Sequence, residues 1–434
     1  MRYNIAYKFR FYPTAEQKAA LAEVFGHTRY VWNWALDLRT RSYYDDGKSL
    51  TYTATSKRLT KLKRDDDHQW LRNVSSVALQ QKLRDLEQAF QNFFDGRTGY
   101  PNFKRKHGKQ TARFASNAFT LYGKALSVAK VPGTLNVRWS RDLSDSCNVT
   151  SVTLTKDPAG RYFVSLTCTE EKEPLPKTDT AVGVDLGITD VVVTSDGFKS
   201  GNPKYLENDL YRLKKAQRRL SRKEKNGPDG PSENWKKQKR RVARLHAKIA
   251  DKRNDFLHKL SRKLVDENQV IALESLNVKG MQQNRSLSRS IADTGWSTLV
   301  RYIEYKAEWA GRTVVKIDRW FPSTKRCSEC RHVGETKPLS VRRWQCEECG
   351  AYHDRDVNAA KNICTAGLAG AQKFLREDCE GRGKTHKAFV RSGHGPVKQY
   401  VFCVSKNPRP LGRGEVNWSR MQEGHRLNHA PGYA

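Results

Sequence analysis

The stretch AVGVDLGITDVVVTSDG at residues 181–197 decides the fold of the second half of the chain. Its apolar runs predict two strands joined at Gly187, and the tripeptide at 195–197 is typical of a hairpin turn. Asp185 ends the first of these strands. The stretch therefore predicts an α/β layer with an acidic side chain at a strand end.

Two further acidic residues occupy similar positions. Glu274 lies near the end of the predicted strand QVIALES (269–275), and Asp356 opens a predicted helix in HDRDVNAAKNI (353–363). Strand ends and helix starts can converge in an α/β layer, and three converging carboxylates repel unless a hard cation such as Mg²⁺ compensates them. Two such ions about 3.5–4 Å apart would activate water for phosphodiester cleavage. The alternatives are a turn cap for Asp185, an ion pair for Glu274 and a helix N-cap for Asp356.

Four of the nine cysteines follow the spacing C-x2-C-x15-C-x2-C, namely Cys327, Cys330, Cys346 and Cys349. Each pair forms a knuckle with two thiolates, and two knuckles complete a tetrahedral zinc site. Four protein ligands leave no open position, so the sequence predicts one structural Zn²⁺ per chain. Without metal, this short charged region would lack a core. We expect the remaining cysteines to be ordinary thiols: Cys147, Cys168, Cys364, Cys379 and Cys403.

The charge of the chain indicates a polyanionic partner. The formal net charge is +34 over 434 residues. Residues 204–263 alone hold 21 Lys or Arg against 7 Asp or Glu. Nucleic acid is the polyanion that best fits such an excess, because neutralised phosphates release condensed counterions. No apolar run is long enough to span a bilayer, and the N-terminus lacks the apolar core of a signal peptide, so we expect a cytoplasmic protein without a membrane partner.

The N-terminal half predicts a β-barrel with an inserted helical domain. Alternating runs in residues 1–13 and 96–173 predict the strands of the barrel. Residues 14–95 carry three helical patterns, the first with a capping box at its start. The second half predicts a helical hairpin at 204–264. The overall class is multidomain α+β.

The three acidic stretches together carry a resemblance to a known family. GVDLGITD (183–190), IALESL (271–276) and HDRDVNAAKNI (353–363) resemble, in order, the three motifs of the RuvC-like nuclease domain of the TnpB family. The cysteine cluster lies between the second and third motifs, as it does in that family. FPSTKRCSEC, DTGWSTLVRYIEYKAEWAGR, RFYPTAEQ and TRYVWNWAL are also similar, and the resemblance covers about residues 1–370.

The resemblance implies an RNase H-like (RuvC) nuclease domain at residues 179–321 and 353–372, interrupted by a zinc ribbon at 322–352. Residues 373–434 form a tail that we expect to be poorly ordered. The family implies an RNA-guided DNA endonuclease of a transposable element, related to type V CRISPR nucleases. Its partners would be a guide RNA transcribed from the end of the element and target double-stranded DNA beside a short flanking motif. We expect a bacterial or archaeal monomer associated with the nucleoid.

Asp185, Glu274 and Asp356 match the catalytic acids of the family. Asp354 is the rival for the third position, and we favour Asp356 because it stands directly before the Val-Asn-Ala-Ala run. The residues that match the family's readers of the flanking motif are Tyr52, Ser56 and Gln80. Glutamine suits bidentate contact with adenine. The plainer alternatives are a core tyrosine and a surface glutamine.

Three other functions compete with an RNA-guided nuclease. A nuclease-inactive RNA-guided repressor would be expected to lose one of the acids. A transposase that performs strand transfer could place its acids on the same fold, so fold alone does not exclude it. A zinc-dependent scaffold would bind nucleic acid without cleaving it. Metal-dependent cleavage separates this scaffold from an RNA-guided nuclease.

Overall fold

The computed structural model describes residues 2–144, 146–225, 230–338 and 340–380. Its N-terminal part contains a five-stranded sheet in the order β2-β6-β7-β1-β5 and a separate pair, β3-β4. The strands are β1 (Arg2–Phe11), β2 (Gln110–Ala115), β3 (Phe119–Tyr122), β4 (Ala125–Val128), β5 (Val137–Arg138), β6 (Asn148–Lys156) and β7 (Tyr162–Glu171). The pairing among these described strands does not close, so the expected β-barrel is not confirmed and an open sheet stands in its place.

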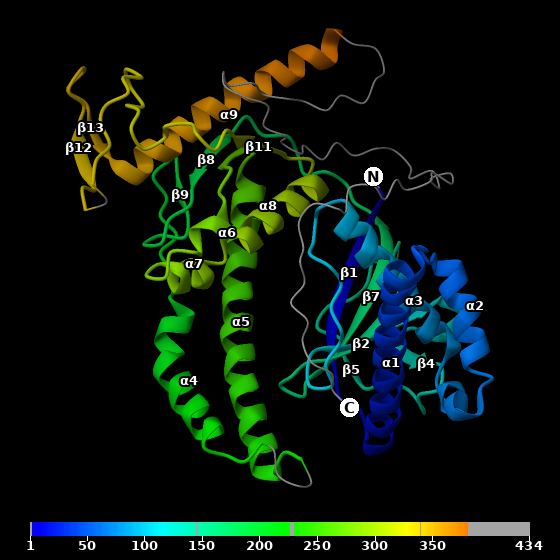
Figure 1. Cartoon of the computed structure of the whole chain (residues 1–434). Helices are drawn as coiled ribbons and strands as arrows, with labels where there is room; N and C mark the ends of the chain where they lie inside the picture. The colour runs from blue at the N-terminus through cyan, green and yellow to red at the C-terminus, as the bar shows by residue number, and fades with distance from the viewer. Residues whose placement is uncertain (1, 145, 226–229, 339, 381–434) are drawn as a thin grey trace. The chain divides into compact units, whose positions relative to one another are not determined.

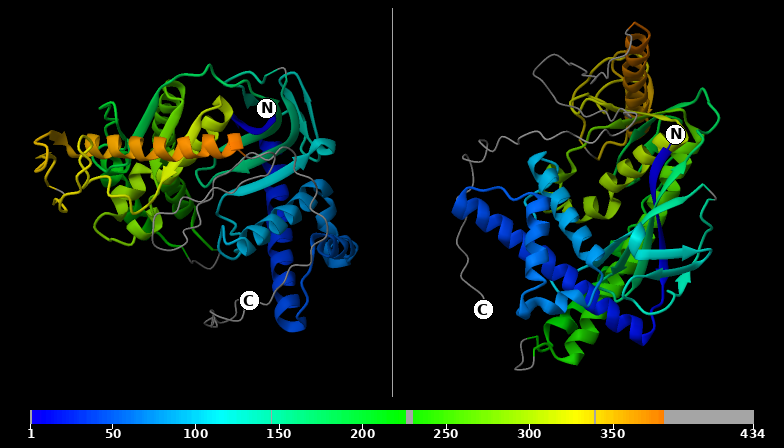
Figure 2. Two further views of the ribbon diagram at one scale, coloured as in Figure 1. Left: turned by 90° about the horizontal axis from the view of Figure 1, so that it is seen from above. Right: turned by 90° about the vertical axis from the view of Figure 1, so that its right-hand side faces the viewer.

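Helices α1 (Ala15–Asp46) and α3 (Ser76–Phe94) cover this sheet, and α2 (Tyr52–Leu62) packs against these two helices. α1 and α3 pack against each other and against β2 (Figures 1 and 2). The capping box at the start of α1 is confirmed, since Thr14 and Gln17 bond reciprocally. Phe9, Leu21 and Leu83 belong to one buried core, so the helices and the sheet share their hydrophobic interior.

Cys147 and Cys168 correct one expectation from the sequence. They form a disulfide with Cα atoms 5.5 Å apart, between the start of β6 and the buried face of β7, and are not separate thiols.

A four-stranded sheet in the order β11-β10-β8-β9 forms the second half. Its strands are β8 (Ala181–Asp185), β9 (Val193–Thr194), β10 (Val270–Glu274) and β11 (Thr313–Ile317), and the first of these pairs in parallel with β10. The predicted helical hairpin is present as α4 (Tyr205–Ser221) and α5 (Glu233–Glu267). The helices that follow are α6 (Val278–Met281), α7 (Ser288–Thr294), α8 (Trp296–Ala310) and α9 (Arg355–Glu380).

Alternation along the central strands directs their side chains to two helical layers. Val184 and Leu273 belong to the core that also contains residues of α5 and α8. Gly183 faces the other way, where a Cβ atom would lie 2.0 Å from the carbonyl oxygen of Ala360 in α9. Glycine is therefore required at position 183 where α9 crosses the sheet. Figure 1 shows this helix lying across β8 and β11.

The predicted zinc-ribbon region carries the short hairpin of β12 (Arg343–Gln345) and β13 (Tyr352–Asp354). Helix α9 starts one residue before Asp356 and continues to Glu380, so residues 373–380 are helical and not part of an irregular tail. The rest of the expected tail lies outside the described residues. Chain contacts divide the protein into two units, Met1–Gly367 and Leu368–Ala434. Within the described residues, no helix combines the length and the apolar character needed to cross a membrane.

Candidate active site and nucleic-acid groove

Two of the predicted acids lie side by side at one edge of the second sheet. The parallel register pairs Leu273 with Val184, so Glu274 and Asp185 are the next residues on neighbouring strands, whose backbones lie about 4.8 Å apart. Both acids alternate away from the core of α5 and α8, and they therefore face the layer of α9. Asp356 lies in the first turn of that helix.

Burial and mutual repulsion make this group of acids hard to ionise together. Burial raises the pKa of Asp185 from 3.8 to about 8, with Glu274 and then Asp356 adding to the effect. Burial also raises the pKa of Glu274, and a hydrogen bond from Ser323 opposes that rise. These interactions indicate that the three carboxylates form one electrostatic cluster, which a hard cation would relieve.

The two aspartates of the third motif have different environments. Asp354 Oδ1 accepts hydrogen bonds from the backbone N–H groups of Asp356 (3.2 Å) and Val357 (3.1 Å), and its other oxygen pairs with Lys199 at 2.7 Å. Burial acts to raise the pKa of Asp354, but these hydrogen-bond donors outweigh burial and lower it. It therefore caps the start of α9. Asp356 instead interacts electrostatically with Asp185. Its Oδ2 atom forms an ion pair with Arg342 Nη1 at 3.3 Å.

The four predicted zinc ligands meet in a second cluster. Their Sγ atoms all lie within 4.8 Å of one another. The Cys327–Cys349 and Cys330–Cys346 sulfur pairs are 3.7 Å and 3.6 Å apart. A tetrahedral Zn²⁺ with Zn–S bonds of about 2.3 Å needs sulfurs about 3.8 Å apart, so the arrangement fits this ion. Among the described residues, these four cysteines are the group of three or more possible metal ligands whose atoms all lie within 4.8 Å of one another; Asp185, Glu274 and Asp356 do not meet that distance as a set.

Sequence inspection did not single out several residues around the acids. Ser323 donates a hydrogen bond of 2.6 Å to Glu274, and Arg342 reaches both Asp356 and the hydroxyl of Thr189. Asn358 and Asn362 are buried polar residues on an otherwise apolar face of α9. Two asparagines four residues apart among alanines were the available signal, because buried amides require hydrogen-bond partners.

Comparison with known proteins gives the family of the chain. Residues 164–285 match the OrfB_IS605 model, described as "Probable transposase"; residues 296–363 match "Cas12f1-like, TNB domain"; and residues 1–48 match "Helix-turn-helix domain". A Streptomyces pristinaespiralis protein named "Putative RNA-guided DNA endonuclease" is 47% identical, over 91% of this chain and 95% of its own length. The chain belongs to the TnpB (OrfB_IS605) family.

A second TnpB-family relative is InsQ of Escherichia coli K12, also named "Putative RNA-guided DNA endonuclease". It is 30% identical over 84% of this chain and 92% of its own length. Among solved structures, the Cas12f1 protein in its complex with sgRNA and target DNA superposes with a TM-score of 0.52, at 13% identity, over 84% of this chain and 99% of that chain. This likeness shows a Cas12f1-like mixed α/β multidomain fold.

The three candidate readers of the flanking motif lie on two packed helices. Tyr52 and Ser56 are four residues apart on α2, so they share one face of that helix. Gln80 is exposed on α3, four residues before Arg84. The Arg84 guanidinium lies 5.4 Å from the centre of the Tyr52 ring, and its Nε donates to the tyrosine hydroxyl at 3.4 Å. Tyr52 is half-buried, and its side chain packs against the N-terminal hydrophobic core.

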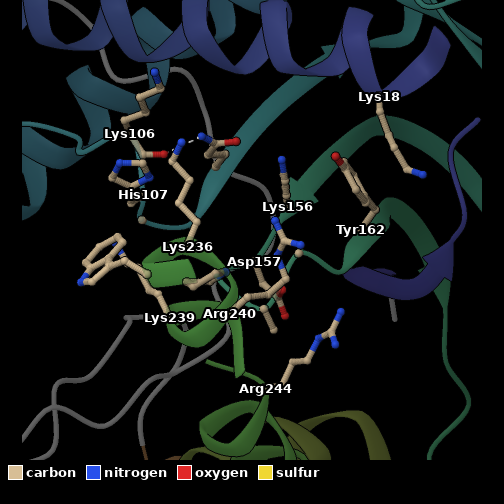
Figure 3. Close-up of a pocket in the computed structure, with 16 residues that line it drawn as sticks. Lys18, Lys106, His107, Lys156, Asp157, Tyr162, Lys236, Lys239, Arg240 and Arg244 are labelled. Atoms are coloured by element: carbon tan, nitrogen blue, oxygen red, sulfur yellow. Dashed lines mark hydrogen bonds between the residues drawn. The ribbon is translucent and has the colours of Figure 1, made fainter. Parts of the chain in front are cut away.

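A basic groove lies between the β6–β7 hairpin and helix α5 in this TnpB-family fold. Its volume is about 540 Å³. Figure 3 shows cationic side chains from α1, β6 and α5 along its walls, namely Lys18, Lys156, Lys236, Lys239, Arg240 and Arg244. Asp157 is the acid among the lining residues, and it pairs with Arg161 at 2.7 Å. The groove is therefore strongly positive and suited to phosphate groups.

Proposed function

We propose that this protein is an RNA-guided, Mg²⁺-dependent DNA endonuclease encoded by a transposable element. It cleaves target DNA next to a short flanking motif. Two relatives, each aligned over more than nine-tenths of its own length, are named RNA-guided DNA endonucleases. The Cas12f1 structure with the similar fold is a complex with guide RNA and target DNA. We further propose that the protein acts as a monomer in the cytoplasm of a bacterium or archaeon, at the nucleoid.

The observation that carries the proposal is the clustering of three acids from three separate parts of the chain. Asp185 and Glu274 end neighbouring parallel strands, and Asp356 enters from α9. Carboxylate oxygens are the ligands that Mg²⁺ prefers, and these three side chains would hold two such ions between them. When bound, the ions supply Lewis acidity and an activated water for phosphodiester hydrolysis. The carboxylates hold this site, and Asp354 fixes the start of the helix that delivers Asp356.

The nuclease domain of the proposal comprises residues 179–321 and 353–372, with a zinc ribbon at 322–352. One Zn²⁺ held by the four cysteines would be structural, because no coordination position remains for water or substrate. In the N-terminal half, residues 1–13 and 96–173 form the sheet module and 14–95 the helical module. We propose no function for residues 381–434.

Guide RNA and target DNA account for the charge of the chain. The basic groove would contact phosphates without regard to sequence, while base pairing with the guide selects the target. Tyr52, Ser56 and Gln80 would read the flanking motif in the DNA. Gln80 is exposed, as such contact requires, and glutamine matches the paired donor and acceptor of adenine.

The test is to purify the protein from cells that carry the complete element and to sequence the RNA that copurifies. The recovered RNA defines a matching DNA target. We expect cleavage of that target only with the RNA and Mg²⁺, and no cleavage by Asp185→Ala at equal RNA content. Purified protein that carries RNA but binds the target without cutting it would point instead to an RNA-guided repressor.

A further inference from the structure

Ser323 lies between the zinc knuckle and the acidic cluster. It follows strand β11 and is 5% exposed. Its hydroxyl donates to Glu274 Oε1 at 2.6 Å. This hydrogen bond engages one carboxylate oxygen of Glu274 and restricts the rotation of the carboxylate group at the end of the side chain. An exposed glutamate would lose that orientation to solvent, whereas Glu274 keeps it because the serine is itself held in place.

Two buried asparagines of α9 hold the segment that carries Ser323. Asn362 Nδ2 donates to the backbone oxygens of Ser323 (2.9 Å) and Arg326 (2.7 Å). Asn358 Nδ2 donates to the same oxygen of Arg326 (2.7 Å), and its Oδ1 accepts from the backbone N–H of Ser328 (2.9 Å). The asparagines are 4% and 1% exposed and four residues apart, so they form one polar stripe on a single helix face.

The two asparagines connect the segment that carries Ser323 and Cys327 to α9, the helix that carries Asp356. Asp356 lies two residues before Asn358 on α9. The tethered segment bears Ser323 near its start and the zinc ligand Cys327 near its end. A shift of the knuckle would therefore move Ser323, and with it the carboxylate of Glu274, relative to Asp356.

We propose that Ser323 is the positioning residue for Glu274, and that Asn358 and Asn362 transmit the order of the zinc knuckle to the catalytic acids through it. The inference rests on the proposed function. Hydrogen-bond partners of metal-ligating carboxylates typically contribute 10–100-fold in metal affinity or activity. Zinc in this arrangement supports catalysis at a distance, because it fixes one end of the tethered segment.

The experiment compares three variants with a matched serine control. Ser323→Ala removes the donor to Glu274, Asn362→Ala removes the tether, and the double variant removes both. Ser328→Ala is the control, because Ser328 lies in the same segment and its buried hydroxyl has no hydrogen-bond partner among the described residues. Mn²⁺ replaces Mg²⁺ as the probe, since it suits carboxylate ligands and its binding is measured directly by electron paramagnetic resonance.

We expect Ser323→Ala to weaken Mn²⁺ binding about 10–100-fold and to raise by a similar factor the Mg²⁺ concentration that gives half-maximal cleavage. Asn362→Ala should change both in the same direction. The double variant should be no weaker than Ser323→Ala alone, because the asparagine acts through the serine. Ser328→Ala should match the wild type, and every variant should keep one zinc per chain.

Three results would overturn the inference. They are Mn²⁺ affinity in Ser323→Ala equal to that of the Ser328→Ala control, additive losses in the double variant, and loss of zinc from Ser323→Ala. The last would assign the serine to the ribbon fold. Failure of the proposed function gives a different result: the wild type and the variants bind Mn²⁺ in the expected order of affinities, but the wild type never cleaves RNA-matched DNA.

Discussion

Asp185 should destabilise the protein when no magnesium is bound. Asp185→Asn keeps the shape of the side chain and removes its charge. Because the folded-state pKa is raised above the unfolded value, the wild type is most stable below about pH 4, where the carboxyl is protonated in both states; stability is then lost as the pH rises, until the folded-state carboxyl ionises near pH 8. The variant should therefore be more stable than the wild type at neutral pH.

The size of the effect follows from the same pKa change. Between 3.8 and about 8, each pH unit costs the folded wild type about 1.4 kcal/mol, which gives a ceiling of about 4 kcal/mol at pH 7. The ceiling treats Asp185 alone, whereas the neighbouring Glu274 also has a raised pKa. The site is also partly open to solvent. We therefore expect Asp185→Asn to add about 2 kcal/mol to the free energy of unfolding at pH 7 and almost nothing at pH 4.

The assay is hydrogen exchange of strand β8 amides, because it reports local opening in a chain that does not unfold as one two-state unit. The buffer should be free of magnesium and of chelators, so that zinc stays bound. Saturating Mg²⁺ should protect the wild type and reduce or reverse its deficit, by mass action. Asp354→Asn is the matched control and should have the opposite sign, because its lowered pKa shows a stabilising charge. Equal protection of wild type and Asp185→Asn from pH 5 to 8 without Mg²⁺ would refute the reasoning.

Three further changes have clear expected outcomes. Gly183→Ala should cost about 1–3 kcal/mol or more and displace α9, because its Cβ would lie 2.0 Å from the Ala360 oxygen; Gly26→Ala, with open space around it, should be harmless in the same thermal unfolding assay. Cys346→Ser should lose zinc by elemental analysis and increase proteolysis within residues 322–352, since a structural metal site contributes directly to local folding; zinc-free native protein with an ordered ribbon would contradict this. Lys239→Ala should weaken RNA binding and reduce the slope of log affinity against log salt by about 1, whereas an unchanged slope would remove Lys239 from the phosphate-binding surface.

Local patterns predicted the elements well because their causes are local. The three helical patterns within residues 14–95 correspond to α1, α2 and α3, and the capping box fixes the start of α1. The strand ends at Asp185 and Glu274 were also correct, since apolar runs mark buried parallel strands. The resemblance supplied the grouping of these acids with Asp356, which residue spacing alone left open.

The sequence patterns did not predict which strands pair with one another in the N-terminal sheet. The strands of the N-terminal half were identified, but β1 pairs with β7 and β5 in a sheet that stays open among the described strands. Nothing in alternation along a strand specifies which neighbour it takes or whether the edges meet. The same limit applies to Ser323 and Asn362, because their partners lie on segments whose proximity only the fold creates.

Cleavage by the two aspartate variants of the third motif is the most direct test of the proposed nuclease site. Asp356→Asn and Asp354→Asn should be compared with the same guide RNA, target DNA and saturating Mg²⁺, after both are shown to be folded and RNA-loaded. A metal ligand should not tolerate loss of its charge, whereas a helix cap replaced by asparagine keeps a good capping group. We predict no cleavage by Asp356→Asn and a substantial fraction of wild-type cleavage by Asp354→Asn. Normal cleavage by Asp356→Asn would contradict the proposed site.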